Sequence, residues 1–182
     1  MANNGSGSIR SVFIEPQAMM NAQLQGRSFM GGGSAADDGR QSEQLMANAK
    51  LALRRLASSV SVVTCRHEGR NYAMTATAVS ALSMEPPSML VCVNRSAAFH
   101  GALNRASEFA INILSRAHVD ISRLCSGGAN PESRFDFGNW DTNAPAPILI
   151  DAQAAIICRK DKALEYGTHT IFMGRIISTA MN

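Results

Sequence analysis

The stretch from Asn71 to Arg95 constrains the fold of this chain more than any other. It begins with hydroxyl residues spaced among alanines, continues through Pro86 and Pro87, and ends in the apolar run Met89–Val93. Proline cannot extend a helix or a central strand, so the pair predicts a turn. The apolar run predicts a buried strand. We interpret the small-residue segment beside this strand as a candidate cradle for a phosphate or a ring.

The rest of the chain predicts short strands and a few helices. β-Branched and apolar runs predict strands at residues 59–65, 72–78, 89–94, 108–114, 148–158 and 170–178. Apolar residues at three- and four-residue spacing predict helices at residues 42–57, 96–106 and 115–124. Residues 126–147 are expected to form a long irregular loop, and such loops are usually functional or mobile. Together these elements predict a mainly β fold with peripheral helices.

The first part of the chain differs in composition from the rest. Residues 1–44 include NNGSGS and GGGS and few β-branched residues, a composition that buries too little apolar surface to offset the cost of ordering. We therefore predict a flexible N-terminal arm over residues 1–44 and a folded domain over residues 45–182. We also consider a short edge strand at Ser11–Ile14, and an arm that wraps a partner subunit.

Composition and charge exclude several classes of protein. The 182 residues are 46% hydrophobic and carry a net charge of +3, which is ordinary for a globular domain. No basic cluster interleaves with aromatic residues, so nucleic acid is not an expected partner. No stretch reaches the roughly 18 apolar residues of a membrane helix, and the first residues lack the basic region and apolar core of a secretory signal, so we expect no such signal. We expect a cytoplasmic protein that binds no membrane.

The four cysteines predict reduced thiols rather than metal ligands. They form no C-x-x-C pair and have no histidine ligand pattern beside them, so we expect no metal site. Three of them lie in apolar runs, where free cysteine behaves as a small core residue. Reduced thiols fit the cytoplasm. The cysteines are Cys65, Cys92, Cys125 and Cys158.

No common nucleotide-binding or nucleophile motif is present, since the chain lacks a G-x-G-x-x-G after a strand, a P-loop and a G-x-S-x-G elbow. We therefore consider each histidine as a candidate site residue. We expect His67 and His118 on the surface and leave His100 open. His169 stands at the mouth of a predicted strand, where a side chain can point into a cleft.

The long loop contains the sequence RFDFGNW, and two interpretations of it stay open. Arg134 lies beside phenylalanine and could grip an anionic or planar ligand. Alternatively, Phe135 and Phe137 anchor the loop to the barrel.

Five segments carry a resemblance to a known family: SSVSVVTC, YAMTATAVSALSMEPPSMLVCV, FAINIL, RFDFGNW and GTHTIFMGRI. Each is weak alone, but in this order and spacing the chain from about Leu45 to Ile177 closely resembles the short-chain flavin reductases. These are the reductase components of two-component flavin monooxygenases. The resemblance implies the FMN-binding split β-barrel fold and a homodimer with the flavin site near the subunit interface. It also implies that NADH or NADPH reduces FMN or FAD by hydride transfer, for delivery to a partner monooxygenase.

The same resemblance assigns residues to a site. His169 would lie at the nicotinamide and is the catalytic candidate, and Arg134 would close on the ligands. Hydroxyl and backbone N–H groups can hold a flavin phosphate without a Rossmann loop, and the cofactor carries the chemistry, so no triad or metal is required. The other residues implied to bind the flavin are Met74, Thr75, Ala76, Thr77, Ala78, Ser80, Cys92, Val93, Asn94, Ser96, Phe109, Ala110 and Asn112.

Three features depart from the family pattern. Ala73 stands where many relatives have glycine, Thr168 stands where many have aspartate, and the chain stops at Asn182, before a segment that usually covers the active site. We therefore keep two alternatives. One is a flavin-binding electron-carrier module with little NAD(P)H turnover. The other is a split-barrel oxidase of a pyridoxamine phosphate-like ligand. That function would need more closely spaced basic residues, to bind a second phosphate, than this sequence has.

Overall fold

The computed structural model describes residues 35–127 and 131–182, and the edge strand considered at residues 11–14 lies outside this range. The chain divides into two units, with the boundary between Arg54 and Arg55. The first unit contains the helix α1, Ala35–Leu53. This helix begins before residue 42 and ends before residue 57, so the predicted arm–domain boundary at residue 44 falls inside it. Alanine, glutamine and arginine favour helix strongly enough to carry it through Gly39, which costs about 1 kcal/mol.

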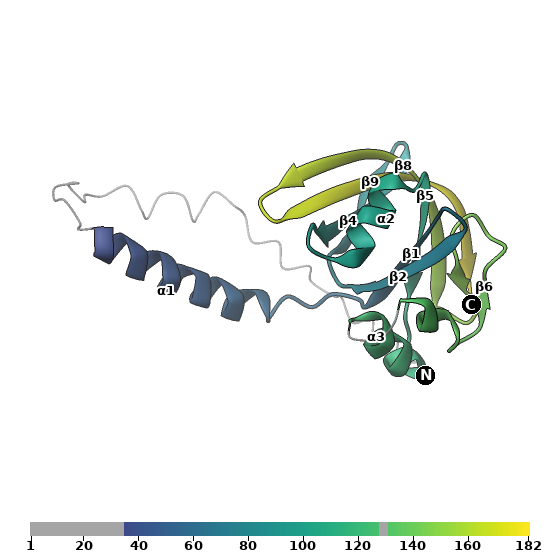
Figure 1. Ribbon diagram of the computed structural model, residues 1–182, viewed down its shortest axis with the longest axis horizontal. Helices are drawn as coiled ribbons and strands as arrows, with labels where there is room; N and C mark the ends of the chain where they lie inside the picture. Colours follow the sequence, from purple (N-terminus) through teal and green to yellow (C-terminus); the bar gives the residue numbers. More distant parts are fainter. Residues whose placement is uncertain (1–34, 128–130) are drawn as a thin grey trace, which may run out of the picture. The chain divides into compact units, whose positions relative to one another are not determined.

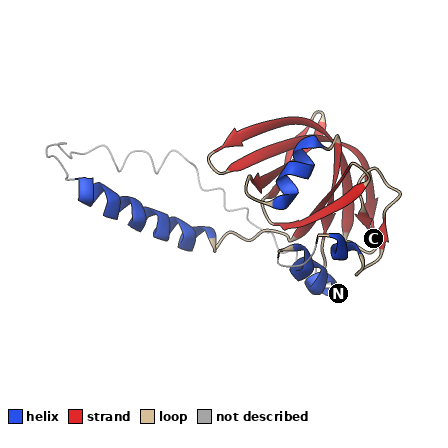
Figure 2. Ribbon diagram, viewed as in Figure 1, coloured by secondary structure: helices blue, strands red, loops and turns tan. Residues whose placement is uncertain are grey.

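The second unit is built on a seven-stranded antiparallel sheet, drawn in red in Figure 2. Its strand order is β2-β1-β5-β8-β9-β4-β3. The strands are β1 (Ser61–His67), β2 (Arg70–Ala76), β3 (Val79–Met84), β4 (Pro87–Asn94), β5 (Glu108–Ile113), β8 (Ala154–Tyr166) and β9 (His169–Met181).

Chain connectivity forces this sheet to close. β2 and β3 lie at opposite edges of the sheet, yet only Thr77 and Ala78 separate them along the chain. Three residue steps, from Ala76 to Val79, span at most about 11 Å. The sheet must therefore curl until its two edges approach each other, which makes it a barrel. The backbone N–H of Cys92 in β4 donates to the carbonyl oxygen of Ala78 at 3.0 Å, and this bond holds the link against the barrel wall.

Short helices complete the unit and lie on different parts of the barrel (Figure 1). The expected helices are present as α2 (Ala98–Arg105) and as η2 (Arg116–His118) continued by α3 (Val119–Cys125). The expected irregular loop contains η3 (Glu132–Phe135) and β6 (Trp140–Asp141), which pairs with β7 (Ile148–Leu149). The predicted fold class, mainly β with peripheral helices, is confirmed.

Two features of the sheet were not predicted from the sequence. One is β3, which precedes the proline pair and has exposed side chains along much of its length. The predicted turn is confirmed at Glu85 and Pro86, while Pro87 opens β4, a position where a strand tolerates proline. The other is the length of β8 and β9, which span 13 residues each and extend past the predicted ends. The single strand predicted at residues 148–158 is wrong, because a turn over residues 150–153 separates β7 from β8. Gly167 turns the β8–β9 hairpin with φ of 55°, a left-handed conformation that favours glycine.

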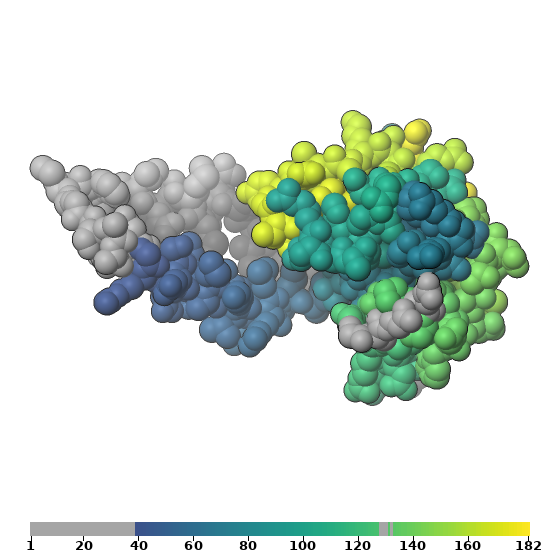
Figure 3. All heavy atoms as spheres, in the orientation of Figure 1, coloured from purple at the N-terminus to yellow at the C-terminus, as the bar shows by residue number. Residues whose placement is uncertain are grey.

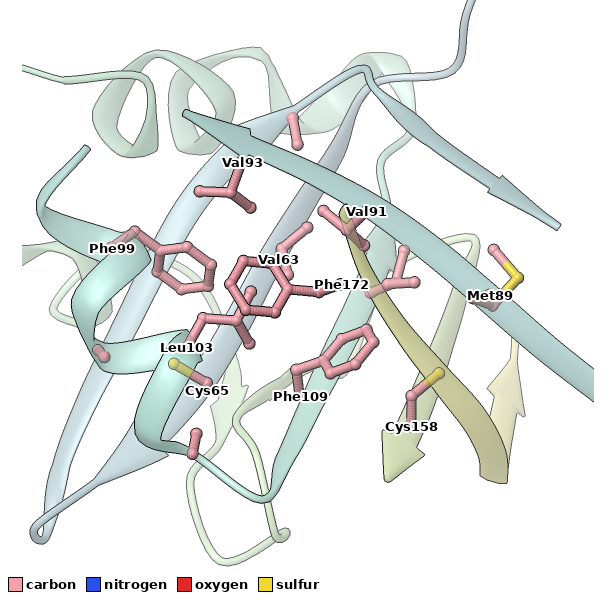
Figure 4. Packing of buried hydrophobic residues seen from close by; sticks show 14 residues of the cluster. Val63, Cys65, Met89, Val91, Val93, Phe99, Leu103, Phe109, Cys158 and Phe172 are labelled. Atoms are coloured by element: carbon pink, nitrogen blue, oxygen red, sulfur yellow. The ribbon is translucent and has the colours of Figure 1, made fainter. Parts of the chain in front are cut away.

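Alternate residues of the strands fill the barrel interior, as the pleat of a strand dictates. Figure 4 shows Val63, Phe109 and Phe172 from three different strands meeting there, with Phe99 and Leu103 of α2 packed onto them. Gly174 of β9 faces the same interior, and a Cβ at this position would lie 2.6 Å from the Phe109 ring. The glycine therefore makes room for the phenylalanine.

The outer surface of the barrel divides into two halves. Over β1, β2 and β5, the helix α3, the η3 turn and the β6–β7 pair pack onto outward side chains such as Val62 and Ala73. We call this the covered half. Over β4, β9 and the distal part of β8, most outward side chains are half-buried or exposed, including Ile171, Met173 and Leu164. We call this the open half. Figure 3 shows the β8–β9 hairpin in yellow and yellow-green beside the teal atoms of α2 and β4.

All four cysteines are free, as the sequence predicts. Cys65, Cys125 and Cys158 are buried, whereas Cys92 is half-buried on the open half. Burial raises the pKa of Cys65 and of Cys158 to about 12, and that of Cys125 to about 11. Desolvation disfavours the thiolate, so these three thiols stay protonated near neutral pH.

Candidate functional site

Strand register brings several predicted site residues to one face. Asn94 of β4 pairs with His169 of β9, and Cys92 pairs with Ile171. Residues that pair directly in antiparallel strands point to the same side of a sheet. Ser80 of β3 pairs with Leu90 of β4 and so belongs to this side as well. The open half thus carries polar groups beside half-buried apolar side chains.

His169 stands exposed at the first position of β9. Its Nδ1 lies 2.9 Å from the hydroxyl oxygen of Thr168. A hydroxyl can orient the ring, but unlike a carboxylate it adds no negative charge beside the ring. His169 is therefore oriented without a counter-ion from Thr168.

Arg95 holds the corner where His169 lies. Its backbone N–H donates to the carbonyl oxygen of Thr168 at 2.9 Å, and its Nη2 donates to the carbonyl oxygen of Gly167 at 2.7 Å. Its Nη1 pairs with Glu165 at 2.9 Å. Sequence reasoning missed Arg95, because an arginine that follows a strand does not show which hairpin it will meet.

The turn after β4 is organised by Asn94. Its Oδ1 accepts hydrogen bonds from the backbone N–H and from the hydroxyl of Ser96, each at 2.9 Å. Both residues are exposed, so the Asn94 amide N–H and the lone pairs of the Ser96 hydroxyl face outward. With Arg95 between them, they form a compact polar corner suited to a phosphate or an amide.

The segment from Met74 to Ser80 does not present all its hydroxyls in one direction. Met74 and Ala76 pack toward the barrel interior. Thr75 points to the covered half, where its hydroxyl donates to the carbonyl oxygen of Ser122 at 2.6 Å. Thr77 and Ala78 form the exposed link between the sheet edges, and Ser80 is exposed on the open half. The accessible hydroxyls of this segment are therefore those of Thr77 and Ser80.

Four residues that the resemblance implied at the flavin are fully buried: Val93, Phe109, Ala110 and Asn112, each 0% exposed. The Asn112 amide donates to the carbonyl oxygen of Val62 at 3.1 Å and accepts from the backbone N–H of Leu149 at 2.8 Å. Val93 faces the barrel interior from β4, and the other three belong to β5, which pairs with a strand on each side. Their side chains support the sheet in this structure, and their contact with a flavin stays a prediction.

Arg134 belongs to the covered half rather than to the face of His169. Its Nη1 donates to the carbonyl oxygen of Ala73 at 2.6 Å, which fixes η3 against β2. Phe135 packs edge-on against Trp140, with ring centroids 5.2 Å apart, whereas Phe137 is 55% exposed. Phe135 therefore anchors the loop as predicted, and Phe137 does not. The buried Nε of Arg134 has no hydrogen-bond partner among the described residues.

Two other histidines have structural positions. His118 was expected on the surface, but it is buried, with Nδ1 accepting from the backbone N–H of Ser115 and Nε2 lying 3.2 Å from Asp151. His118 occupies the N3 position of a capping box in which Ser115 is the N-cap of η2. A single histidine in a sequence does not reveal such a role. His100 bonds to Thr170 Oγ1 at 2.9 Å and packs against Phe172.

The open half fits a flavin. An isoalloxazine ring needs a broad apolar surface, and Leu90, Ile171 and Met173 supply one without being fully buried. Ser80 and the corner around Asn94 supply hydrogen-bonding groups at its edge. Within residues 35–127 and 131–182, no group of His, Cys, Asp and Glu is placed to hold a metal ion. The same residues contain no helix long and apolar enough to cross a membrane.

Comparisons with known proteins show the family of this chain. Residues 53–182 match the family model described as flavin reductase like domain. The chain is 39% identical over 134 residues to the reductase component of an FADH(2)-dependent resorcinol hydroxylase from a Rhizobium species, covering 72% of this chain and 75% of that one. It is 36% identical to an FMN reductase (NADH), RutF, from Ancylobacter novellus, covering 71% and 72% of the two chains.

A solved structure gives the same picture at the level of the fold. The NADH:FAD oxidoreductase SgcE6 from Streptomyces globisporus, solved with NAD and FAD fragments, is similar with a TM-score of 0.66 and 28% identity. The match covers 74% of this chain and 83% of that one.

Proposed function

Because the chain belongs to the flavin reductase-like domain family, we propose that it is an NADH-dependent flavin reductase. It reduces FMN or FAD and supplies the reduced flavin to a partner monooxygenase in the cytoplasm. The observation that carries this proposal is the open half, where His169 stands beside an uncovered apolar sheet face. The relatives named as FMN reductase (NADH) and as a hydroxylase reductase component support it.

The chain's own residues bind and orient the reactants. The flavin, when bound, accepts the hydride, so no side chain has to act as a nucleophile. Ser80, Thr77 and the polar corner around Asn94 hold the flavin by its edge and phosphate. His169 holds the nicotinamide through its imidazole. The principal contribution to the rate is the proximity and orientation of the two rings.

A homodimer completes this proposal. Leu164 is 54% exposed and Tyr166 is 81% exposed on the β8–β9 hairpin, next to Ile171 and Met173 on the same side of the sheet. Exposed apolar patches of this kind mark interaction surfaces. A second copy packed on Leu164 and Tyr166 would cover this part of the open half and leave His169 at its border. This arrangement would shield the reacting rings from water.

The decisive experiment measures NADH oxidation at 340 nm with the purified chain and added flavin. We expect oxidation that depends on flavin, with NADH preferred to NADPH. FMN, FAD and riboflavin are compared in the same series to establish which flavin is used. The absence of flavin-stimulated oxidation with either nicotinamide would refute the proposal.

The electron-carrier alternative rests on one specific observation, the Thr168 hydroxyl in place of a carboxylate beside His169. A protein that purifies yellow, retains its flavin on gel filtration and oxidises neither nicotinamide would favour this alternative. A protein that binds flavin reversibly and turns over would favour the reductase.

A further inference from the structure

A cleft of about 430 Å³ opens where the residues before β1 meet the end of β5 and the start of α3. None of the residues that line it belongs to the open half. Its walls combine apolar side chains, hydroxyls and two cations, and no acidic residue is among those that line it. The lining residues are Val60, Leu114, Ser115, Arg116, His118, Val119, Ser122 and Arg123.

The charge of this cleft favours an anion. Arg116 is exposed and makes no ion pair within the described part of the chain. Arg123 is 3.5 Å from Asp120, and both side chains are more than 70% exposed. Because water screens an exposed pair, Asp120 neutralises little of the positive charge at the cleft. Buried His118 already faces Asp151 at 3.2 Å, which leaves the arginines as the binding groups.

The apolar residues of the cleft restrict what kind of anion it suits. Val60 is 37% exposed and Val119 is 47% exposed, so both offer hydrocarbon surface at the mouth beside a guanidinium. A guanidinium group stacks on planar rings and also pairs with phosphate oxygens. An apolar slot beside exposed arginines therefore suits a ligand that is part flat ring and part phosphate. The volume lies within the usual range for small-molecule pockets.

The position of the cleft relates it to the candidate flavin site. Val60 precedes Ser61, which pairs with Ala76 across β1 and β2 at about 5 Å. Ala78 follows within about 7 Å, and its carbonyl oxygen accepts from Cys92 on the open half. The cleft and the open half therefore lie on either side of the exposed link formed by Thr77 and Ala78. A dinucleotide is long enough to reach across such a link.

We propose that this cleft binds the ADP half of a dinucleotide, with Arg116 and Arg123 on the phosphates and Val60 and Val119 against the adenine. The proposal rests on the reductase function, because the other half of the dinucleotide would be the flavin or the nicotinamide at the open half. FAD and NADH share the ADP half, so either one fits the chemistry of the cleft. FMN keeps only the phosphate next to its ribityl chain and lacks the AMP part of FAD, so its binding does not use the cleft.

The first experiment tests the cleft directly with ADP, by calorimetric titration of the whole chain in the absence of flavin. We expect Arg116→Ala to weaken ADP binding about tenfold, because a hydrogen bond to a charged group is lost. Arg123→Ala should change binding in the same direction. Arg70→Ala is the matched control, since Arg70 is exposed at the other end of β2. Undetectable ADP binding, or equal weakening in the Arg70 control, overturns the proposal.

The second experiment assigns the source of the ADP half. The ratio of KM for FAD to KM for FMN, with NADH saturating, should rise about tenfold in Arg116→Ala if the cleft takes the flavin dinucleotide. A rise in KM for NADH measured with FMN, at an unchanged flavin ratio, assigns the cleft to the nicotinamide dinucleotide. If neither quantity changes, the proposal is overturned. A chain that reduces no flavin at all would instead refute the reductase function, so the two failures are distinguishable.

Discussion

The covered half and the open half of the barrel are built from the same pleated sheet, with alternate residues pointing outward in both. On the covered half, Val62 is 0% exposed and Ala73 is 1% exposed beneath α3 and the β6–β7 pair. On the open half, Leu164 and Tyr166 remain mostly exposed. The difference lies in what the rest of the chain places on each half. A half that its own chain covers serves stability, whereas an apolar half left uncovered is suited to binding.

The largest expected effect compares one aspartate on each half. Val62→Asp places an unpaired charge in a sealed apolar site, so we expect a loss of about 3 kcal/mol or more in the free energy of unfolding. Leu164→Asp should change the stability of the monomer by no more than about 0.5 kcal/mol. Denaturant titration measures both changes. In sedimentation experiments, Leu164→Asp should also abolish self-association. Equal destabilisation by both substitutions would show that Leu164 is buried, which contradicts the description of the open half.

The next effect concerns catalysis at the border of the open half. His169→Ala should raise KM for NADH about tenfold, or about 1.4 kcal/mol, while the Kd for FMN changes less than about twofold. His67→Ala, at the far end of β1, is the control and should alter neither constant. A parallel loss of flavin and nicotinamide binding in His169→Ala would assign the histidine a structural role.

A smaller effect separates two hydroxyls that look alike in sequence. Thr75→Val removes the bond to the Ser122 carbonyl on the covered half, so we expect a stability loss of about 1 kcal/mol. Ser80→Ala on the open half should leave stability within about 0.5 kcal/mol and weaken FMN binding about fivefold. Thermal unfolding and fluorescence titration of the same two variants give these values. The reverse assignment would contradict the division into halves.

The smallest expected effect concerns the reactivity of the thiols in the unaltered chain, with one variant as a control. Burial raises the pKa of Cys65 and of Cys158 to about 12, so their thiolate fractions are very small near pH 8. Cys92, half-buried on the open half, should react first with a thiol reagent, and saturating FMN should slow this reaction. Cys92→Ala should remove the fast phase. Protection by FMN of a buried cysteine instead would argue against the proposed flavin face.

Much of the fold was readable from local patterns. The strands around Val63, Val91 and Phe109 follow from apolar and β-branched runs, and the turn at Pro86 follows from the chemistry of proline. β3 was missed because its side chains are largely exposed, so its apolar pattern is weak. The distal part of β8 was missed because charged residues there are held in a strand by pairing with β9 rather than by propensity.

The candidate site was readable only in part. The resemblance pointed to the segments, and the register of β4 and β9 then brought Asn94 and His169 together. Pairing of β5 with β1 and β8 places Phe109 in the barrel interior, while Ala110 packs against Ala146 and Asn112 bonds to Leu149. Arg134 turned out to hold its own loop on Ala73. Nothing local signals these placements, because they depend on which strands become neighbours.

The sequence by itself determined the family, the mainly β architecture, the free thiols and the hydroxyl-rich segment that begins near Asn71. Tertiary structure alone decided which of those hydroxyls face a ligand and which half of the barrel stays open. Local pattern reflects interactions between residues near in the chain, such as turn formation and the alternation of a strand. Whether an outward side chain is covered depends on segments many residues away, as Val62 beneath Leu149 and Ile121 shows. The two-residue link at Thr77 and Ala78 connects local sequence to tertiary structure, because a link this short forces the two edges of the sheet together and closes the barrel.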